Sequence, residues 1–413
     1  MHVYLFSPIP YSFLHQRPQK IADQFAARSC PVTFIEPCGL TEYLAGRKKG
    51  LIRLACFSIV FQVLGLLALV FPALGAKPRP RRRSGHPVPG IRSVSMPIVV
   101  PINRVDSPFI ERLNAAVYRQ TLRWRVFRRM EEDEQSVALV ENPYWGSILR
   151  KGDFAKVAYD CLDEISLFSG RASSERFTEY ERQVLQLADA VFVTAERLEE
   201  DLKSKGIGPA PVRVPNGVDY EWFRRRAKEE PMPADIQKIK RPVIGYMGIL
   251  RDWFDYDLVG VLAREAPELS FVMVGPLDFE HRIAHLRGIP NLYWLGRKEY
   301  RDVPQYIDAF DVCVIPFRSG KISMTTNPVK VFEYFALGKP VVSTPLFELK
   351  TFSDQGLLRL GESKEAFATA IRQSLSESGP EKAGKREEVA RQYSWRELTG
   401  RMMSTIIASP GRQ

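Results

Sequence analysis

The chain has 413 residues, which is enough for two domains of ordinary size. Its apolar content of 45% and charged content of 26% are those of a folded globular protein and exclude a largely disordered one. The formal net charge is +11, but no nucleic-acid-binding module is recognisable, so we expect the basic clusters to face an anionic membrane surface and no nucleic acid. The five cysteines lack metal-ligand spacing, which is typical of a reducing cytoplasm.

Short apolar runs alternate with helical patterns along the whole chain, which indicates parallel α/β sheets. The first half predicts strands at 3–6, 32–36, 91–94, 137–140, 156–159, 190–194 and 212–214, and the second half at 243–246, 270–274, 292–295, 312–315 and 340–343. The start of the chain is interpreted as the first of these strands and not as a signal peptide, because its apolar run is short and no basic segment precedes it.

The intervening segment 223–241 is rich in charge and contains two prolines, so it is interpreted as an interdomain linker. We therefore expect an N-terminal domain at 1–222 and a C-terminal domain at 242–385. The last helical stretch, 386–413, is expected to cross back to the first domain.

An uncharged apolar run at 54–75 forms the centre of an insertion near 51–76 in the first domain. It is long enough to span a bilayer, but a single crossing would separate the first strand from its sheet neighbours. Basic residues at both ends also give no preferred orientation. We expect an interfacial or re-entrant helix that holds a cytoplasmic protein peripherally or monotopically at the inner membrane. A buried core helix and a true membrane span are the alternatives.

The segment 327–344 carries the most chemical information in the chain. It is interpreted as a polar loop, a short helix, a glycine stop and a buried strand. Lys330 and Glu333 are three residues apart, so a helix places both on one face near its N-terminus, where a phosphate is favoured. The glutamate can accept hydrogen bonds from sugar hydroxyls. Together they indicate a nucleotide-diphosphate-sugar site, and a surface ion pair is the alternative interpretation.

A second phosphate-type pattern follows the strand at 243–246. Gly248 allows a phosphate to approach the backbone closely, and Arg251 can reach that phosphate with its planar donor fork. A glycine turn after a strand is weak evidence by itself. Its value comes from its occurrence in the same predicted domain as Lys330.

Several motifs together resemble those of glycosyltransferase family 4, and in particular bacterial teichuronic acid and exopolysaccharide glycosyltransferases. They are SPIP at 7–10, QRPQ at 16–19, YDCLDE at 159–164, VPNGVD at 214–219, GIL at 248–250, VGP at 274–276, LGR at 295–297 and the Lys330/Glu333 helix. The resemblance implies an α/β protein of the GT-B fold, with two Rossmann-like parallel-sheet domains that face a central cleft.

By this resemblance the C-terminal domain binds the nucleotide sugar. Lys330 and Arg251 would hold the diphosphate, Glu333 the ribose hydroxyls, and the Gly248 backbone would lie against the phosphates. Many members have a further glutamate eight positions before the one equivalent to Glu333. This chain has Thr325 there, so Thr325 and Asn327 would offer neutral hydrogen bonds to the sugar instead.

The N-terminal domain would bind the acceptor. Arg17 would contact a phosphate or an anionic acceptor there. Asp160 and Asp163 lie in the loop after the strand at 156–159, where carboxylates could steady positive charge on the sugar ring or orient the acceptor hydroxyl. The alternative is that Asp160 ties the loop and Asp163 caps the next helix.

The expected function is a retaining, metal-independent glycosyltransferase of the hexosyltransferase type. It would move a sugar from a nucleotide-diphosphate sugar, as co-substrate and without another cofactor, to a glycan or lipid-linked acceptor of a bacterial envelope or exopolysaccharide at the cytoplasmic membrane face. A GT-B sugar epimerase or phosphorylase and a catalytically silent membrane-associated scaffold are the alternatives.

Overall fold

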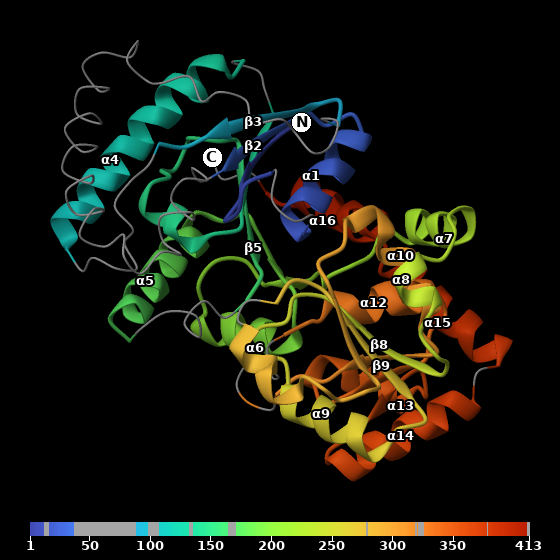
Figure 1. Cartoon of the computed structure of the whole chain (residues 1–413). Helices are drawn as coiled ribbons and strands as arrows, with labels where there is room; N and C mark the ends of the chain where they lie inside the picture. The colour runs from blue at the N-terminus through green and yellow to red at the C-terminus, as the bar shows by residue number, and fades with distance from the viewer. Residues whose placement is uncertain are drawn as a thin grey trace. The chain divides into compact units, whose positions relative to one another are not determined.

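A computed structural model describes residues 1–11, 16–36, 88–97, 107–131, 135–163, 171–277, 280–318, 320, 326–377 and 379–410. The chain divides into two compact units (Figure 1). The first unit contains Met1–Val193, Leu198–Arg213 and Arg401–Gln413. The second contains Thr194–Arg197 and Val214–Gly400.

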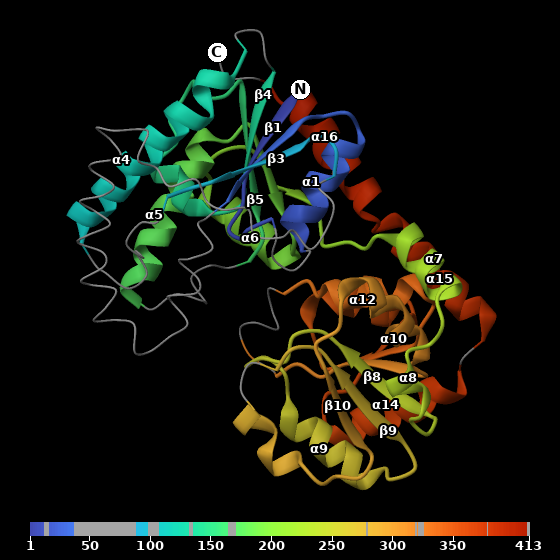
Figure 2. The same ribbon diagram turned by 45° about the horizontal axis from the view of Figure 1, so that its top comes forward.

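The first unit is built on a seven-stranded sheet with the order β3-β2-β1-β4-β5-β6-β7, and all its strand pairs are parallel. The strands are β1 (His2–Phe6), β2 (Val32–Glu36), β3 (Ile91–Ser95), β4 (Ser136–Val140), β5 (Lys156–Cys161), β6 (Ala190–Val193) and β7 (Val212–Arg213). Its helices include α1 (Arg17–Ala27), α4 (Pro108–Arg125), α5 (Arg171–Leu187) and α6 (Glu196–Lys205), with short 3₁₀ turns η3 (Phe127–Arg129) and η4 (Pro143–Ser147). Figure 2 shows these helices around the sheet. Every residue of β4 is buried, as expected for a parallel strand covered on both faces.

The second unit is built on a six-stranded parallel sheet with the order β10-β9-β8-β11-β12-β13. Its strands are β8 (Val243–Met247), β9 (Ser270–Val274), β10 (Leu292–Gly296), β11 (Val312–Ile315), β12 (Val341–Ser343) and β13 (Arg359–Leu360). Its helices include α7 (Tyr220–Glu229), α8 (Ala234–Gln237), α9 (Tyr256–Glu265), α10 (Val303–Ala309), α12 (Val329–Ala336), α13 (Lys350–Asp354), α14 (Lys364–Ser376) and α15 (Pro380–Gln392). The 3₁₀ turns are η6 (Glu280–Leu286), η7 (Tyr300–Asp302) and η8 (Phe347–Leu349). The last helix, α16 (Trp395–Ala408), begins in the second unit, and its residues from Arg401 onward belong to the first.

The sequence predicted each long strand of both sheets within about one or two residues, and the α/β class is confirmed. It missed β13, whose two residues are too few to show a period. The segment 223–241 was interpreted as a linker, but the structure assigns it to the second unit. Its charges lie on the outer sides of α7 and α8, while Phe223 and Ile236 are buried in the core of that unit.

The apolar run at 54–75 and the whole insertion near 51–76 lie outside the described residues. Among the helices that the structure describes, none combines the length and the apolar character needed to cross a bilayer. The predicted interfacial helix therefore stays a prediction.

Candidate functional site

The carboxyl edge of the second sheet brings together two residues that lie far apart in the sequence. Gly248 directly follows β8 and has a φ of 148°, a backbone conformation that favours glycine. A Cβ atom at this position would collide with Cε and Nζ of Lys330, the second residue of α12. The absence of a side chain at Gly248 is therefore what lets the Lys330 ammonium lie against the end of β8.

Lys330 lies in an aromatic setting. Its Nζ atom is 5.4 Å from the centroid of the Tyr246 ring and 5.7 Å from that of Phe317. Among the described residues it makes no salt bridge. Burial lowers the pKa of the Lys330 ammonium, and the nearby Glu333 carboxylate partly offsets this effect. A partly desolvated ammonium that lies over ring faces is suited to an anionic ligand. The ligand would supply the negative counter-charge that Lys330 lacks among the described residues.

The backbone around Gly248 is fixed by the neighbouring strands. The Gly248 N–H donates to the Val274 carbonyl at 2.8 Å, and the Tyr246 hydroxyl donates to the Ile249 carbonyl at 3.0 Å. Gly275 also has a φ of 148°, and a Cβ there would collide with the Gly248 carbonyl. The two glycines thus pack backbone to backbone at the ends of β8 and β9, which leaves little freedom in the position of the turn.

Three other residues that the sequence predicts for the nucleotide-sugar site are Arg251, Glu333 and Thr325. Arg251 is exposed three residues beyond Gly248, with its guanidinium carbon 5.8 Å from the Trp253 ring centroid. Glu333 is partly buried one helical turn after Lys330 on α12. Thr325 lies outside the described residues.

Asn327 is buried, and its hydrogen bonds go to the loop that carries the VPNGVD motif. Its Oδ1 atom accepts from the Asn216 N–H at 3.1 Å, and its carbonyl accepts from the Asn216 side-chain amide at 2.8 Å. These bonds fix the residue just before Pro328, the N-cap of α12. Asn327 therefore positions the start of the Lys330 helix, and its predicted contact with the sugar stays a prediction.

In the first unit, Arg17 and Asp160 bind each other. Arg17, the first residue of α1, donates from Nε and Nη2 to the two carboxylate oxygens of Asp160 in β5, each at 2.8 Å. Both side chains are buried, with 4% and 0% of their surface exposed. The alternative interpretation, in which Asp160 ties the loop, fits this geometry better than the predicted contacts with acceptor or reacting sugar, because a bidentate buried pair has its charges already matched.

Sequence reasoning missed a third charged residue in this region, Glu141. It follows β4, the strand beside β5, and is 3% exposed, and neither of its carboxylate oxygens has a hydrogen-bond partner among the described residues. Burial raises its pKa well above the usual value, and the Asp160 carboxylate raises it further while Arg17 opposes this shift. Two buried carboxylates thus compete for one guanidinium. The available signal was a carboxylate directly after the predicted strand at 137–140, at the same sheet edge as Asp160, which follows the predicted strand at 156–159.

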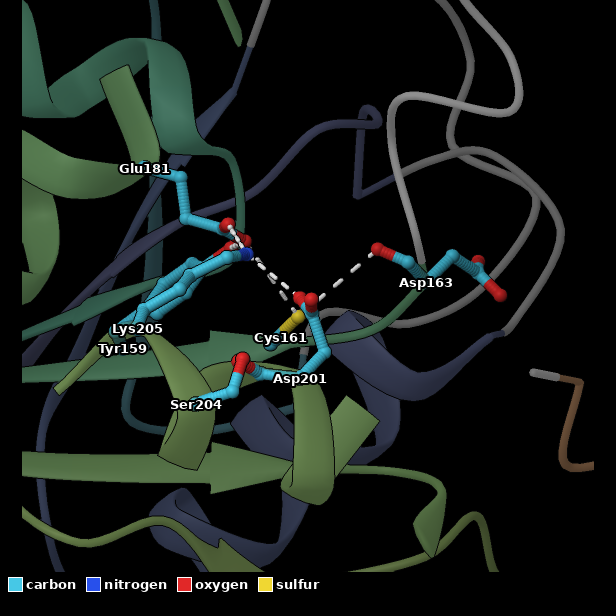
Figure 3. A network of polar contacts seen from close by, with 7 residues as sticks. All are labelled: Tyr159, Cys161, Asp163, Glu181, Asp201, Ser204 and Lys205. Carbon is cyan, nitrogen blue, oxygen red and sulfur yellow. Dashed lines mark hydrogen bonds and ion pairs between the residues drawn. The ribbon is translucent and has the colours of Figure 1, made fainter. Parts of the chain in front are cut away.

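The opposite side of β5 carries a separate polar network (Figure 3). The Glu181 carboxylate on α5 accepts from the Tyr159 hydroxyl at 2.9 Å and from Lys205 on α6 at 2.7 Å. Burial raises the pKa of the Tyr159 hydroxyl and of the Cys161 thiol, so both stay neutral in this network. Cys161 donates weakly to the Asp163 carbonyl at 3.9 Å. Figure 3 shows the exposed Asp163 carboxylate pointing away from these residues, so its predicted role near the acceptor stays open.

Within the part of the chain that the structure describes, no three His, Cys, Asp or Glu side chains form a group that could hold a metal ion. The predicted metal independence is not tested by this finding.

Comparisons with known proteins show which sequences and folds the chain is similar to. Residues 241–377 match the family model of glycosyl transferases group 1. The chain is 28% identical over 264 residues to TuaH of Bacillus subtilis (strain 168), provisionally named a teichuronic acid biosynthesis glycosyltransferase. This match covers 60% of the chain and 66% of TuaH, slightly less than two thirds.

Solved structures resemble the chain over nearly its whole length. HepE of Anabaena, in complex with UDP and glucose, is 13% identical with a TM-score of 0.58, and covers 99% of this chain and 100% of its own. A trehalose-6-phosphate structure from E. coli bound with UDP-2-fluoro glucose is 12% identical with a TM-score of 0.67, and covers 100% of both chains. At these identities the likeness establishes the fold, which is GT-B with two Rossmann-like domains, and the chain resembles bacterial polysaccharide glycosyltransferases.

Proposed function

We propose that the chain is a retaining glycosyltransferase that moves a sugar from a nucleotide-diphosphate sugar to a cell-envelope or exopolysaccharide acceptor at the cytoplasmic face of the membrane. The contact between Gly248 and Lys330 carries this proposal. It places a desolvated ammonium against a bare backbone turn, inside the region that matches the family model.

In the proposed reaction the bond between the sugar and the diphosphate breaks and negative charge develops on the leaving phosphate. Lys330 stabilises that charge at the N-terminal end of α12, where the helix dipole acts in the same direction. Because Lys330 has a lowered pKa in the free protein, a bound diphosphate would raise that pKa again. Glu333 accepts hydrogen bonds from the ribose, and the exposed Arg251 adds its guanidinium to the diphosphate contacts. The leaving diphosphate takes the acceptor proton on the same face, so this scheme needs no metal and no strong base from the protein.

The UDP-containing complexes of the structural relatives favour a UDP-sugar as the first donor to test. The name of TuaH favours an envelope polysaccharide as the acceptor. The Arg17–Asp160 pair holds the acceptor-side domain in shape, and Asp163, at the exposed end of the β5 loop, is the remaining candidate for an acceptor contact.

The test is binding and turnover of UDP-, GDP-, ADP- and TDP-sugars by the purified chain and by Lys330→Ala. A charge-assisted hydrogen bond contributes about 1.5–3 kcal/mol, so Lys330→Ala should weaken nucleotide binding by roughly 10- to 150-fold. Lys364→Ala is the matched control, because it removes a lysine of the same domain that is half exposed on α14.

Calorimetry and product analysis separate the outcomes. Loss of binding in Lys330→Ala but not in Lys364→Ala, with transfer of the sugar to an acceptor and retention at its anomeric carbon, would support the proposal. Equal nucleotide affinity in both variants would refute the site. Conversion of the nucleotide sugar to its epimer would refute the transferase and leave the binding site standing.

A further inference from the structure

Helix α4 has an exposed face of unusual composition. The apolar residues of the helix that face the domain are buried, among them Tyr118 and Leu122. Phe109, Arg112 and Arg123 lie on the outer side, where a spacing of three and fourteen residues from Phe109 keeps them on one face. We call the outward set the α4 surface; it consists of Phe109, Arg112, Arg123, Trp124, Arg128 and Arg129.

This surface belongs to a helix that is fixed to its domain. Glu111 forms an ion pair with Arg176 on α5, and Arg119 forms a bidentate pair with Asp153. Figures 1 and 2 show α4 as a long helix at the margin of the first unit, beside α5. Arg125 is also used internally, because it donates to the Ser95 carbonyl at 2.9 Å.

The remaining arginines are not neutralised within the described residues. Arg112, Arg123, Arg128 and Arg129 make no salt bridge there, and all four are exposed. Burial and the positive charge of Arg129 both lower the pKa of Arg92 on the adjoining strand β3. Four exposed arginines on one surface create a local positive potential that attracts an anionic partner, although the exposed carboxylate of Glu131 follows Arg129 closely and the acidic residues at 132–134 lie outside the described residues.

Two large aromatic side chains also belong to this surface, one near each end of α4. Phe109 is 75% exposed and Trp124 is 42% exposed, and the Arg128 guanidinium lies 3.5 Å from the centroid of the Trp124 ring. The separation of fifteen positions between the two aromatics corresponds to roughly 22 Å of helix. An aromatic side chain near each end of α4, with arginines between and beyond them, matches the interface of an anionic bilayer, where arginines meet lipid phosphates and aromatic rings enter the head-group layer.

We infer that the α4 surface is a docking face for an anionic lipid bilayer, with its arginines on the head-group phosphates and Phe109 and Trp124 inserted between them. The inference deepens the membrane location in the proposed function, on which it rests, but it does not depend on the transferase activity. It also does not involve the apolar run at 54–75.

Vesicle co-sedimentation of the full chain tests this inference without any substrate. The wild type should bind vesicles of phosphatidylcholine mixed with phosphatidylglycerol more tightly than vesicles of phosphatidylcholine alone, and the difference should shrink as salt is raised. Neutralising an arginine near an anionic surface should weaken binding roughly fivefold. The double variant Arg112→Gln/Arg123→Gln should therefore lose roughly 25-fold in affinity for the anionic vesicles.

Arg225→Gln/Arg301→Gln is the matched control. These arginines are also well exposed, at 62% and 75%, but they lie on the second unit, so their loss lowers the net charge equally without touching α4. A second measurement uses vesicles that contain brominated lipid, which quenches tryptophan at the bilayer surface. Trp124→Phe should lose most of the quenching seen in the wild type.

Equal binding of both double variants to anionic vesicles would overturn the inference, since attachment would then reside elsewhere in the chain. Indifference of the wild type to lipid charge, or unchanged quenching in Trp124→Phe, would overturn it as well. Binding of the wild type to an acidic polymer such as RNA but not to vesicles would assign the surface to a different class of partner and would also refute it. The vesicle-binding and quenching measurements do not depend on nucleotide-sugar transfer. The membrane-docking inference and the proposed transferase activity can therefore be refuted independently.

Discussion

Three buried ionisable residues show how this fold uses desolvation at the scale of single residues. Arg17 and Asp160 match each other's charge through two hydrogen bonds, whereas Glu141 has no such partner among the described residues. A carboxylate without partners in an apolar setting is more stable when protonated. Glu141 and Asp160 therefore have opposite effects on stability although they lie at the ends of neighbouring strands.

We expect Glu141→Gln to stabilise the protein at neutral pH. In the folded state the pKa of Glu141 is raised well above its ordinary 4.5, so the folded protein keeps a proton that the unfolded chain loses. The contribution of this carboxyl group to the stability of the wild type is fully present below pH 4.5. It is lost as the pH rises towards the raised pKa. The free energy of unfolding should fall by about 1.4 kcal/mol per pH unit in that window relative to Glu141→Gln, which does not titrate there. Urea unfolding of both proteins at a series of pH values measures the difference.

Asp160→Asn is the control for this prediction, since it removes the same charge one strand away. It leaves Arg17 buried without a counter-charge and should cost about 3–5 kcal/mol of stability. A parallel response of the two variants, or a flat pH profile of their difference, would contradict the assignment of Glu141 as the unmatched member.

At the scale of secondary-structure elements, several distant segments are joined by a single side chain. Lys156, at the start of β5, donates to the carbonyls of Ile406, Ile407 and Ser409 at 2.7, 2.8 and 2.7 Å. These carbonyls lie at the C-terminal end of α16, where helix carbonyls lack partners and a positive charge is favoured. One ammonium thus satisfies three acceptors and attaches the last helix to the first sheet.

Lys156→Met should detach this end of α16. The change keeps an aliphatic chain but removes the three donors, so we expect a loss of about 2 kcal/mol in the stability of the first unit. Hydrogen exchange should accelerate in the last turn of α16 and stay unchanged in β8 and β9. Lys203→Met serves as comparison, because Lys203 is more than half exposed and pairs only with Glu199 one turn away, and it should change the stability by less than about 0.5 kcal/mol. Equal exchange rates at the end of α16 in both variants would contradict the anchoring role.

At the scale of the whole molecule, each unit has its own sheet and its own chemistry. The proposed nucleotide contacts come from the second unit alone, through Gly248, Lys330 and Glu333. The unmatched carboxylate and the α4 surface belong to the first unit. A ligand that binds only the native second unit should therefore stabilise that unit and leave the first one nearly unchanged.

Saturation with the preferred nucleoside diphosphate should slow hydrogen exchange in β8, β9 and α12, with little change in β1, β4 and β5. At a ligand concentration of 100 times the Kd the expected stabilisation is about 2.7 kcal/mol. The Lys330→Ala variant should lose this protection at the same ligand concentration. Equal protection of β4 and β5 by the nucleotide alone would show that the binding residues are not confined to the second unit.

The sequence by itself determined the strands of both sheets except β13, the α/β class, and the Lys330 helix with its glycine stop. These features are local, because apolar runs bounded by turn residues and the spacing of helical side chains are written in consecutive residues. It also indicated Gly248 and Lys330 separately, from a glycine turn and from a helix N-terminus, but it could not show that the lysine packs against that glycine.

Only the tertiary structure decided which charged groups meet. Arg17 and Asp160 are 143 residues apart in the chain, and nothing near either residue predicts a buried bidentate pair. The same holds for Asn216 with Asn327 and for Lys156 with the end of α16. Burial and electrostatic matching depend on which strands become neighbours in the sheet, so the identity of Glu141 as the carboxylate left without a partner follows from the fold and not from the residues around it.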